Sequence, residues 1–278
     1  MAIKNFIPTI WSEHLIQDLS HKRVAVNNSN LAYEGEIREK GSRVQVCGLF
    51  PVTISNYEKN TEIAAPEMLE DYHNDIVIEQ AKYFNFMIDD VDRAQADPKL
   101  LNLAIANASS ALAREADKYI YSLYEKADQT FALRGPTPEQ IVDLILDARV
   151  YFQNSGITDL NDIIIEVSPT IAAQLVKAKL KYGIDTSDTF ETGCIGRICG
   201  SKVFVSPDIV LTAEDSYECS KCFMRTKRAI GFAEQFSEIE AYRPESRFAD
   251  AVKGLYLFGA DVVVPTELIT LDIGIEVL

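Results

Sequence analysis

The stretch that decides the fold runs from Asp97 to Ala127 and reads DPKLLNLAIANASSALAREADKYIYSLYEKA. Asp97 suits a helix N-cap, and Pro98 suits a first helical turn. Apolar side chains then recur every three or four residues, which keeps one face apolar for about seven turns; they are Leu101, Ile105, Ala108, Leu112, Ala116, Tyr119, Leu123 and Ala127. The pattern predicts one helix roughly 45 Å long, stiff enough to act as a beam for the rest of the chain.

Before this helix, the pattern changes to that of short strands. Residues 44–46 and 52–54 form β-branched or alternating runs between glycines and a proline, and a second run covers Ile76 to Ile88. We predict a long two-stranded excursion whose polar tip lies around 56–75. Earlier still, apolar residues at helical spacing predict a short amphipathic helix at the end of an extended arm; they are Trp11, Leu15, Ile16 and Leu19.

After Gly135 and Pro136 the pattern is that of an α/β region. Helices are predicted at 138–151 and 169–182, the second with Ser168 as cap, and a buried strand at 162–167. Glycine-punctuated strands follow at 195–205 and 223–236. The last segment reads as long strands at 239–243 and 254–264, ended by Pro265.

Composition excludes several classes of protein. The 278 residues, 47% of them hydrophobic, are enough for a substantial core without staples. No run approaches the ~18 apolar residues of a membrane span, and the first eleven residues lack the pattern of a signal peptide. We therefore expect a protein that is made and kept in a cytoplasm and is not associated with a membrane. The net charge of −15 disfavours general nucleic-acid binding, so a protein of this kind that surrounds DNA would contain it rather than grip it.

The catalytic motifs that require a fixed spacing are absent from the sequence, including the nucleophile elbow, the phosphate loop and the zinc-protease helix. Gly193, Gly196 and Gly200 before Lys202 come nearest to a phosphate loop, but a Val-Phe-Val strand follows where a helix is needed. These glycines are interpreted as tight turns between strands.

Five cysteines form an odd set, which fits a reducing compartment; they are Cys47, Cys194, Cys199, Cys219 and Cys222. Cys219 and Cys222 supply the spacing of two zinc ligands, which Cys194 and Cys199 could complete. A redox pair would stand at a helix start, whereas this pair lies in a polar run before a strand. An ordinary turn with free thiols is favoured over a metal or disulfide staple, and catalysis is the weakest alternative.

The remaining titratable residues are also interpreted without a catalytic or metal-binding role. His14, His21 and His73 all precede the α/β region, so triad or general-base chemistry there lacks its usual base, and surface or interface polarity is expected. The acidic groups Asp89–Asp92 and Asp71 with Asp75 are interpreted as solvated or helix-capping rather than as a cation site. We predict no catalytic residue, no cofactor-binding residue and no metal ligand.

The order of these elements, with their wording, resembles the major capsid proteins of tailed bacteriophages of the Hong Kong phage type. The resemblance covers nearly the whole chain, and it rests on a series of short strings rather than on one motif. They are Phe6–Ser12 (FIPTIWS), Tyr33–Ile37 (YEGEI) through Gly41 to Val46, Asp89–Ala96 (DDVDRAQA), Gly193–Pro207 (GCIGRICGSKVFVSP), Arg228–Ala233 (RAIGFA) and Phe258–Pro265 (FGADVVVP).

The resemblance implies an α+β capsid fold with four parts. They are an N-terminal arm (1–32), an extended two-stranded loop (33–88), a peripheral domain with the long spine helix (89–134 and 232–278) and an α/β axial domain (135–231). The function it implies is structural and not enzymatic. The chain would assemble with itself, as pentamers and hexamers, into the icosahedral head that encloses the phage genome.

The resemblance also implies binding partners and a location for the protein. The sequence lacks the long charged helical N-terminal extension of some relatives, which implies a separate scaffolding protein beside the portal; packaged double-stranded DNA would be enclosed without sequence-specific binding. The location implied is the virion, assembled in the host bacterial cytoplasm. Lys59 and Asn60 lie in the region where some relatives form a covalent Lys–Asn bond, although nothing else in the sequence indicates one. Two alternatives remain, the shell of a cellular nanocompartment and a soluble α/β enzyme that uses the Cys219–Cys222 region.

Overall fold

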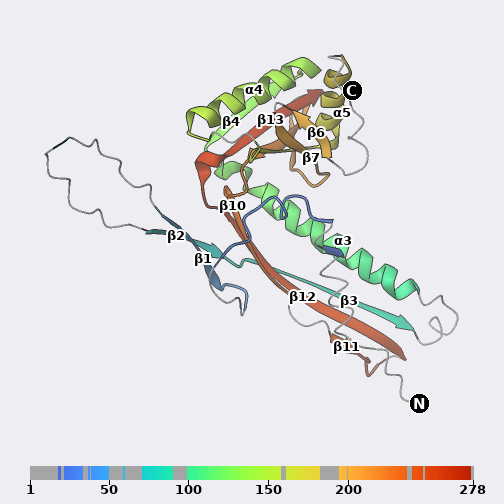
Figure 1. The fold of residues 1–278 in the computed structure, drawn as a ribbon. Helices are drawn as coiled ribbons and strands as arrows, with labels where there is room; N and C mark the ends of the chain where they lie inside the picture. The colour runs from blue at the N-terminus through green and yellow to red at the C-terminus, as the bar shows by residue number, and fades with distance from the viewer. Residues whose placement is uncertain are drawn as a thin grey trace.

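A computed structural model describes residues 18–19, 22–33, 37, 39–49, 59, 71–89, 99–157, 161–181, 194–198, 200–236, 240–246 and 248–276. Its strands form two larger sheets and a two-stranded projection (Figure 1). The helices include α3 (Lys99–Tyr121), α4 (Pro138–Asn154) and α5 (Pro169–Lys181), with short 3-10 helices η1 (Ser122–Lys126) and η3 (Pro265–Glu267).

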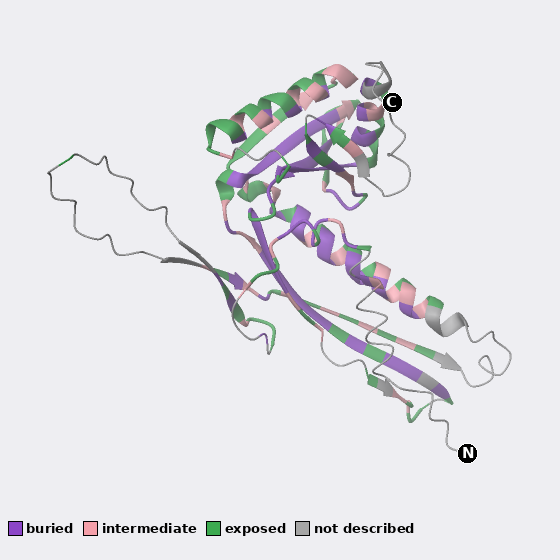
Figure 2. Cartoon of the chain, in the orientation of Figure 1, coloured by how far each residue is buried: buried purple, intermediate pink, exposed green. Residues whose placement is uncertain are grey.

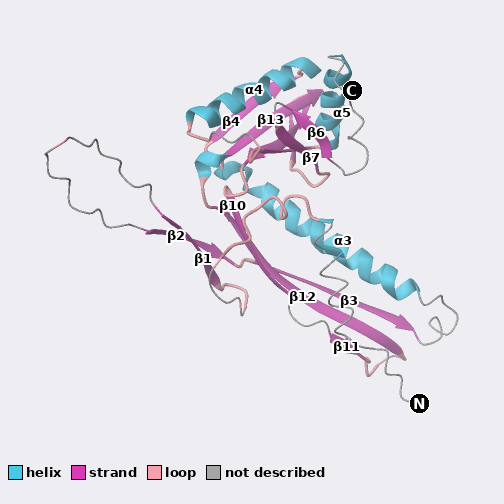
Figure 3. Cartoon of the chain, in the orientation of Figure 1, coloured by secondary structure: helices cyan, strands magenta, loops and turns pink. Residues whose placement is uncertain are grey.

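The seven-stranded sheet has the order β4-β13-β9-β5-β7-β6, and β8 pairs with β9 beside that path. Its strands are β4 (Gln129–Arg134), β5 (Ile164–Val167), β6 (Cys194–Ile198), β7 (Ser201–Val205), β8 (Leu211–Glu214), β9 (Tyr217–Arg225) and β13 (Leu268–Glu276). Figure 3 shows this sheet together with α4 and α5. We call the sheet and its helices the axial region.

The two faces of this sheet differ because successive side chains of a strand point to opposite sides. On one face, Phe131 of β4 packs edge-on against Tyr151 of α4. On the other, Phe223 of β9 packs against Tyr121 at the end of α3, and Thr270 of β13 donates to the backbone oxygen of Tyr124 in η1. The sheet is therefore held between its own helices and the end of the long helix.

The four-stranded sheet is built around the long strand β12 (Ala249–Val262). β3 (Gln80–Asp89) pairs with β12 on one side, and β10 (Ile230–Phe236) and β11 (Glu240–Tyr242) pair with it on the other. Helix α3 runs along this sheet, and its Ile105 clusters with Val252 of β12 (Figure 1). We call the sheet and α3 the peripheral region; Figure 2 shows the buried residues concentrated along β12 and on one side of α3.

The projection consists of β1 (Arg43–Leu49) and β2 (Asp71–Val77), which pair antiparallel from Arg43 opposite Val77 to Leu49 opposite Asp71. The predicted excursion is thus confirmed in its described part. Its second strand is a correction, because the run from Ile76 to Ile88 is not one strand. The chain leaves β2 after Val77, Ile78 exchanges backbone hydrogen bonds with Gly41 and Ser42, and β3 then joins the other sheet.

The long helix is confirmed with a different end. The α-helical part stops at Tyr121, and residues 122–126 wind more tightly as η1 before β4 begins at Gln129. This winding brings the Tyr124 oxygen within 2.9 Å of Thr270 Oγ1 on the axial sheet. Asp97, Pro98, most of the arm and the polar tip of the excursion lie outside the described residues, apart from Lys59 at the tip.

The strands predicted at 195–205 and 223–236 each prove to be two. The first divides at Gly200 into β6 and β7, and the second divides at the turn 226–229 into β9 and β10, which belong to different sheets. The four-part domain division stays a prediction, but the sheets do not follow two of its boundaries. β4 and β13, which it assigns to the peripheral domain, pair within the axial sheet because β13 lies between β4 and β9.

Candidate functional site

The cysteine pair lies inside β9 rather than in a turn, which corrects that prediction. Both are free thiols and both are buried. An odd separation along a continuous strand places them on opposite faces of the sheet, so they cannot bind one metal ion together. Burial raises the pKa of Cys222 to about 12 and also raises that of Cys219, which keeps both thiols protonated at neutral pH.

The other sequence candidates are also scattered. Gly200, in a left-handed conformation, forms the turn between β6 and β7, whereas Gly196, also at positive φ, lies at the register shift within β6. His73 lies in β2, and Asp89 ends β3. Gly193, Cys199, His14, His21 and Asp90–Asp92 lie outside the described residues. No cluster of three or more metal-ligating side chains occurs among the described residues.

A buried polar cluster lies where the two regions meet, around Arg225 at the end of β9. Its guanidinium is fully buried and forms an ion pair with the equally buried Glu166 of β5, with Nε to Oε2 at 3.0 Å and Nη2 to Oε1 at 3.1 Å. The remaining donors bind the backbone oxygens of Ala25 and Asn28 at 2.8 Å and Ser29 Oγ at 3.1 Å. All five N–H donors of the arginine are thereby used.

Asp117 of α3 holds the same segment from the other side. Its Oδ2 accepts from the backbone N–H of Val24 at 2.8 Å, and its Oδ1 accepts from that of Val26 at 3.1 Å. Burial raises the pKa of this carboxyl to about 6, against the lowering effect of the two backbone hydrogen bonds, and the charges of Glu166 and Asp208 raise it further. The carboxyl is therefore easier to protonate than an exposed aspartate.

The same segment also joins the four-stranded sheet. Asn30 forms a parallel β-bridge with Gly231, because its N–H donates to the oxygen of Ile230 and its own oxygen accepts from Phe232. At the other end of the segment, Arg23 forms an ion pair with Glu234 of β10. Residues 23–30, which we call the strap, thus contact α3, the axial sheet and the peripheral sheet (Figure 1).

The projection is anchored by close packing against the peripheral sheet. Val44, Val46 and Ile76 on its inner face cluster with apolar side chains of the peripheral sheet. Gly259 of β12 makes the closest approach, since a Cβ there would lie 2.2 Å from the backbone oxygen of Val77. The opposite face is polar and carries Arg43, Gln45 and Asp75, with the Arg43 and Asp75 side chains 3.5 Å apart.

The outer face of the peripheral sheet exposes apolar side chains. Tyr83 of β3 is 78% exposed, and Leu255, its partner in the β12 register, is 37% exposed. Met87 continues the same face of β3 and is also exposed. Exposed apolar side chains gathered on one face are characteristic of interaction surfaces.

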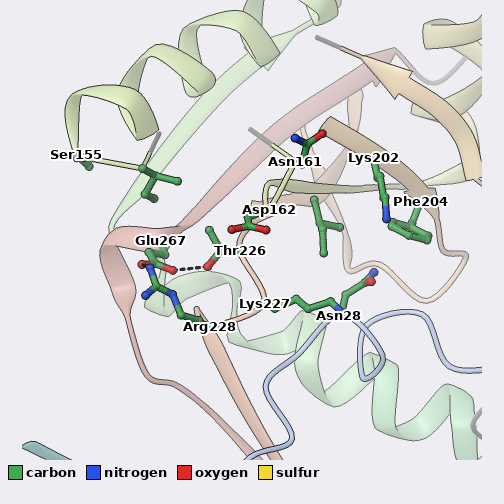
Figure 4. A pocket seen from close by; sticks show the side chains of 13 residues that line it. Asn28, Ser155, Asn161, Asp162, Lys202, Phe204, Thr226, Lys227, Arg228 and Glu267 are labelled. Atoms are coloured by element: carbon green, nitrogen blue, oxygen red, sulfur yellow. Dashed lines mark hydrogen bonds and ion pairs between the residues drawn. The ribbon is translucent and has the colours of Figure 1, made fainter. Parts of the chain in front are cut away.

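A crevice of about 1140 Å³ lies beside the strap and at the end of the axial sheet. Figure 4 shows Lys202 and Phe204 of β7 on one side and Asn28 of the strap near Lys227 below them. Arg228 is bound to Glu267 at 2.5 Å, and Thr226 also donates to Glu267. The lining is mixed in charge. Its hydroxyl-carboxylate pair is Thr226 with Glu267, and this carboxylate is also bound to Arg228, so the geometry supports no catalytic assignment.

Comparisons with known proteins agree at the level of fold. No protein-family model matches the sequence, and no curated protein matches it. A solved structure from Mycobacterium phage Che8 is similar over 97% of this chain and 98% of that chain, with 25% identity and a TM-score of 0.67. The mature capsid of bacteriophage PhiM1 is similar over 90% of this chain and 87% of that chain, with 12% identity and a TM-score of 0.64.

The chain has the tailed-phage major capsid fold. A virus-like particle from Pyrococcus furiosus is also similar, over 93% of this chain and 96% of that chain, with 12% identity and a TM-score of 0.55. The capsid fold predicted from the order of the elements is therefore confirmed, including the spine helix and the two-stranded loop.

Within the capsid fold, sequence reasoning missed the residues that join its regions. The periodicity assigns Glu166 only to a buried-strand run, DIIIEV, although a carboxylate in such a run already indicates a buried cationic partner. Asp117 gave a similar signal, since it follows Ala116 on the apolar side of the helical pattern. Nothing local distinguished Arg225, whose partners Ala25, Asn28 and Ser29 lie 196 to 200 residues earlier in the chain.

Proposed function

We propose that this chain is the major capsid protein of a tailed bacteriophage, the subunit of the icosahedral head that encloses the phage genome. The observation that carries the proposal is the capsid fold, shared with the Che8 phage structure over nearly the full length of both chains. Its role is structural. The scattered candidates for catalysis, together with protonated, buried cysteines, support a subunit that is not an enzyme.

The shape of the subunit supports assembly with copies of itself. A two-stranded ribbon is at best marginally stable alone, and the described part of this one packs at its base against the peripheral sheet. The exposed apolar face around Tyr83 and Leu255 likewise needs a cover. In the proposed shell the arm and the extended loop clasp neighbouring subunits, and the axial regions meet around five-fold and six-fold positions as pentamers and hexamers. Modest contacts then add up through symmetry.

The remaining partners follow from the same role. A separate scaffolding protein and a portal would direct assembly in the bacterial cytoplasm, and the product would be the virion capsid. The net charge of −15 supports enclosure of double-stranded DNA without sequence-specific binding. Maturation of the shell would be a rigid-body rearrangement with refolding of the loop. Among the described residues no helix is long and apolar enough to cross a membrane.

The shell of a cellular nanocompartment is the second candidate, because a virus-like particle has a similar fold. Gene neighbours separate the two candidates. Terminase and portal genes beside this one support the phage head, whereas a gene for a cargo enzyme supports the nanocompartment.

Electron microscopy tests the shell itself. The protein is expressed alone and together with the scaffolding protein encoded beside it, and the products are imaged in negative stain. Closed icosahedral shells, or rings and tubes of capsomers, are the expected result. A uniform population of monomers or dimers under both conditions would overturn the proposal.

A further inference from the structure

The strap, residues 23–30, is bound through its backbone by charged groups from both regions. On the axial side Arg225 binds the oxygens of Ala25 and Asn28, and Glu166 accepts from the Asn28 side-chain amide at 2.9 Å. On the peripheral side Asp117 binds the N–H groups of Val24 and Val26. Side chains that bind backbone groups recognise a conformation of the segment rather than its sequence.

The strap is also short and lies between parts that belong to different sheets. The β-bridge at Asn30 and Gly231 fixes one end to β10, and the ion pair of Arg23 with Glu234 fixes the other end to the same strand. Between these two points, Arg225 and Glu166 fix the strap to the axial sheet. The strap therefore ties the axial sheet to β10, and a change in the angle between the regions must break one set of these contacts.

We propose that the strap is a conformational switch that couples the axial region to the peripheral region, and that the charge state of Asp117 sets how firmly it is docked. The inference concerns the single subunit and does not depend on the proposed shell role. It assigns to residues 23–30 a task different from clasping neighbours.

The sign of the effect follows from the surroundings of Asp117. Glu166 of β5 and Asp208 after β7 are acidic and disfavour its negative charge, and Arg114 on its own helix already binds Asp208 at 2.9 Å. Arg225 of β9 is committed to Glu166 and to the strap, and Tyr121 of α3 is uncharged, since its pKa is raised well above the usual value by burial. No cation binds Asp117 among the described residues, so its carboxylate is held by two backbone N–H groups alone.

The docked state consequently binds a proton more readily than an undocked state in which Asp117 meets water. Docking is firmest below pH 4 and weakens as the pH rises through about 6, the pKa of the docked carboxyl. With an ordinary value of 3.8 for the undocked carboxyl, the docking equilibrium changes by at most on the order of a hundredfold. At neutral pH docking of the strap is thus weakened, because the docked state must bury the negative charge of Asp117.

Hydrogen exchange tests the switch. Deuterium uptake of peptides that cover residues 23–30 is measured in the full-length protein at pH 5 and pH 8, corrected for the intrinsic exchange rate, and compared with peptides from α4. We expect the protection factor of the strap to fall by about tenfold between pH 5 and pH 8, because most of the remaining change lies below pH 5. Protection in α4 should not change over this range.

Two variants make the result specific. Asp117→Asn keeps the shape of the side chain and removes its titration, so strap protection should no longer depend on pH. Asp147→Asn changes an exposed aspartate of α4 and should behave as the unaltered protein. Equal strap protection at both pH values, an unchanged pH dependence in Asp117→Asn, or a loss of protection that spreads equally to α4 would each overturn the proposal.

Discussion

At the scale of single residues, the most demanding group in this molecule is the buried guanidinium of Arg225. A buried charge is tolerated only when it is paired and its hydrogen-bonding capacity is used, and Arg225 meets both conditions through Glu166 and the strap. Because its partners come from β5 and from residues 25–29, the contacts of one side chain hold together segments far apart in sequence.

Replacement of Arg225 by methionine should therefore be costly. It leaves Glu166 as an uncompensated buried charge and the oxygens of Ala25 and Asn28 without their donor, so we expect the free energy of unfolding to fall by about 3–5 kcal/mol. Guanidinium unfolding of the unassembled subunit measures it. Arg228→Met removes an arginine that also forms an ion pair but is 74% exposed, and it should cost less than about 1 kcal/mol. Equal effects of the two changes would refute the role of Arg225.

A second residue-scale prediction concerns the glycines under the projection. Gly259→Ala would push a Cβ against the backbone oxygen of Val77 at 2.2 Å, and backbone cannot yield as a side chain does. Gly231→Ala would meet side-chain methyl groups rather than backbone, with those of Ile76 and Val263 nearest, at 2.7 and 2.9 Å. We expect Gly259→Ala to destabilise by more than 2 kcal/mol, in the range of overpacked cores, and Gly231→Ala by less. Protease cleavage within the projection should rise most in Gly259→Ala; the reverse order would contradict this.

At the scale of elements, the periodicity of the sequence predicted helices whose ends are set by neighbouring residues. It missed strand boundaries and pairings that are set by residues far away in the chain. α4 and α5 begin at the predicted prolines, because Thr137 and Ser168 cap them from the adjacent residue. The break between β2 and β3 was missed because the apolar run continues through Ile78, which is buried in the cluster beneath the projection. The sheet to which β3 belongs is set by its pairing with β12, which lies about 170 residues later in the chain. The pairing of β13 with both β4 and β9 is equally invisible to local patterns.

The exposed face of the peripheral sheet yields an element-scale prediction about assembly. Tyr83→Lys places a charge on the apolar face of β3, and we expect fewer closed shells while the free energy of unfolding of the isolated subunit changes by less than about 0.5 kcal/mol. Tyr83→Phe keeps the apolar surface and serves as the matched control. Particle yield is counted by electron microscopy. Normal yields from Tyr83→Lys would mean that this face stays uncovered in the shell.

At the scale of the whole molecule, the pH dependence of stability combines carboxyls whose pKa is lowered by folding with one whose pKa is raised by folding. The Lys82 side chain lowers the pKa of Glu115, and the Arg134 side chain lowers that of Glu214, so both groups favour folding at higher pH and lose this contribution as the pH falls. Asp117 opposes them. Its folded pKa is raised, so its contribution is fully present below its unfolded value of 3.8 and is lost as the pH rises through about 6.

These contributions overlap in the unaltered protein. The contribution of Asp117 is therefore isolated by the difference in free energy of unfolding between the unaltered protein and Asp117→Asn. Between pH 4 and pH 7 the free energy of unfolding of the unaltered protein should fall relative to that of Asp117→Asn, by at most on the order of 3 kcal/mol for a pKa change from 3.8 to about 6. The amide variant leaves one of the two strap N–H groups without an acceptor, but that cost does not depend on pH and cancels from the slope. Guanidinium unfolding of both proteins at pH 4, 5, 6 and 7 measures the difference. A flat difference would mean that water reaches the carboxyl in the folded subunit, whereas a difference of the opposite sign would mean that the two N–H groups of the strap outweigh the cost of burying the charge.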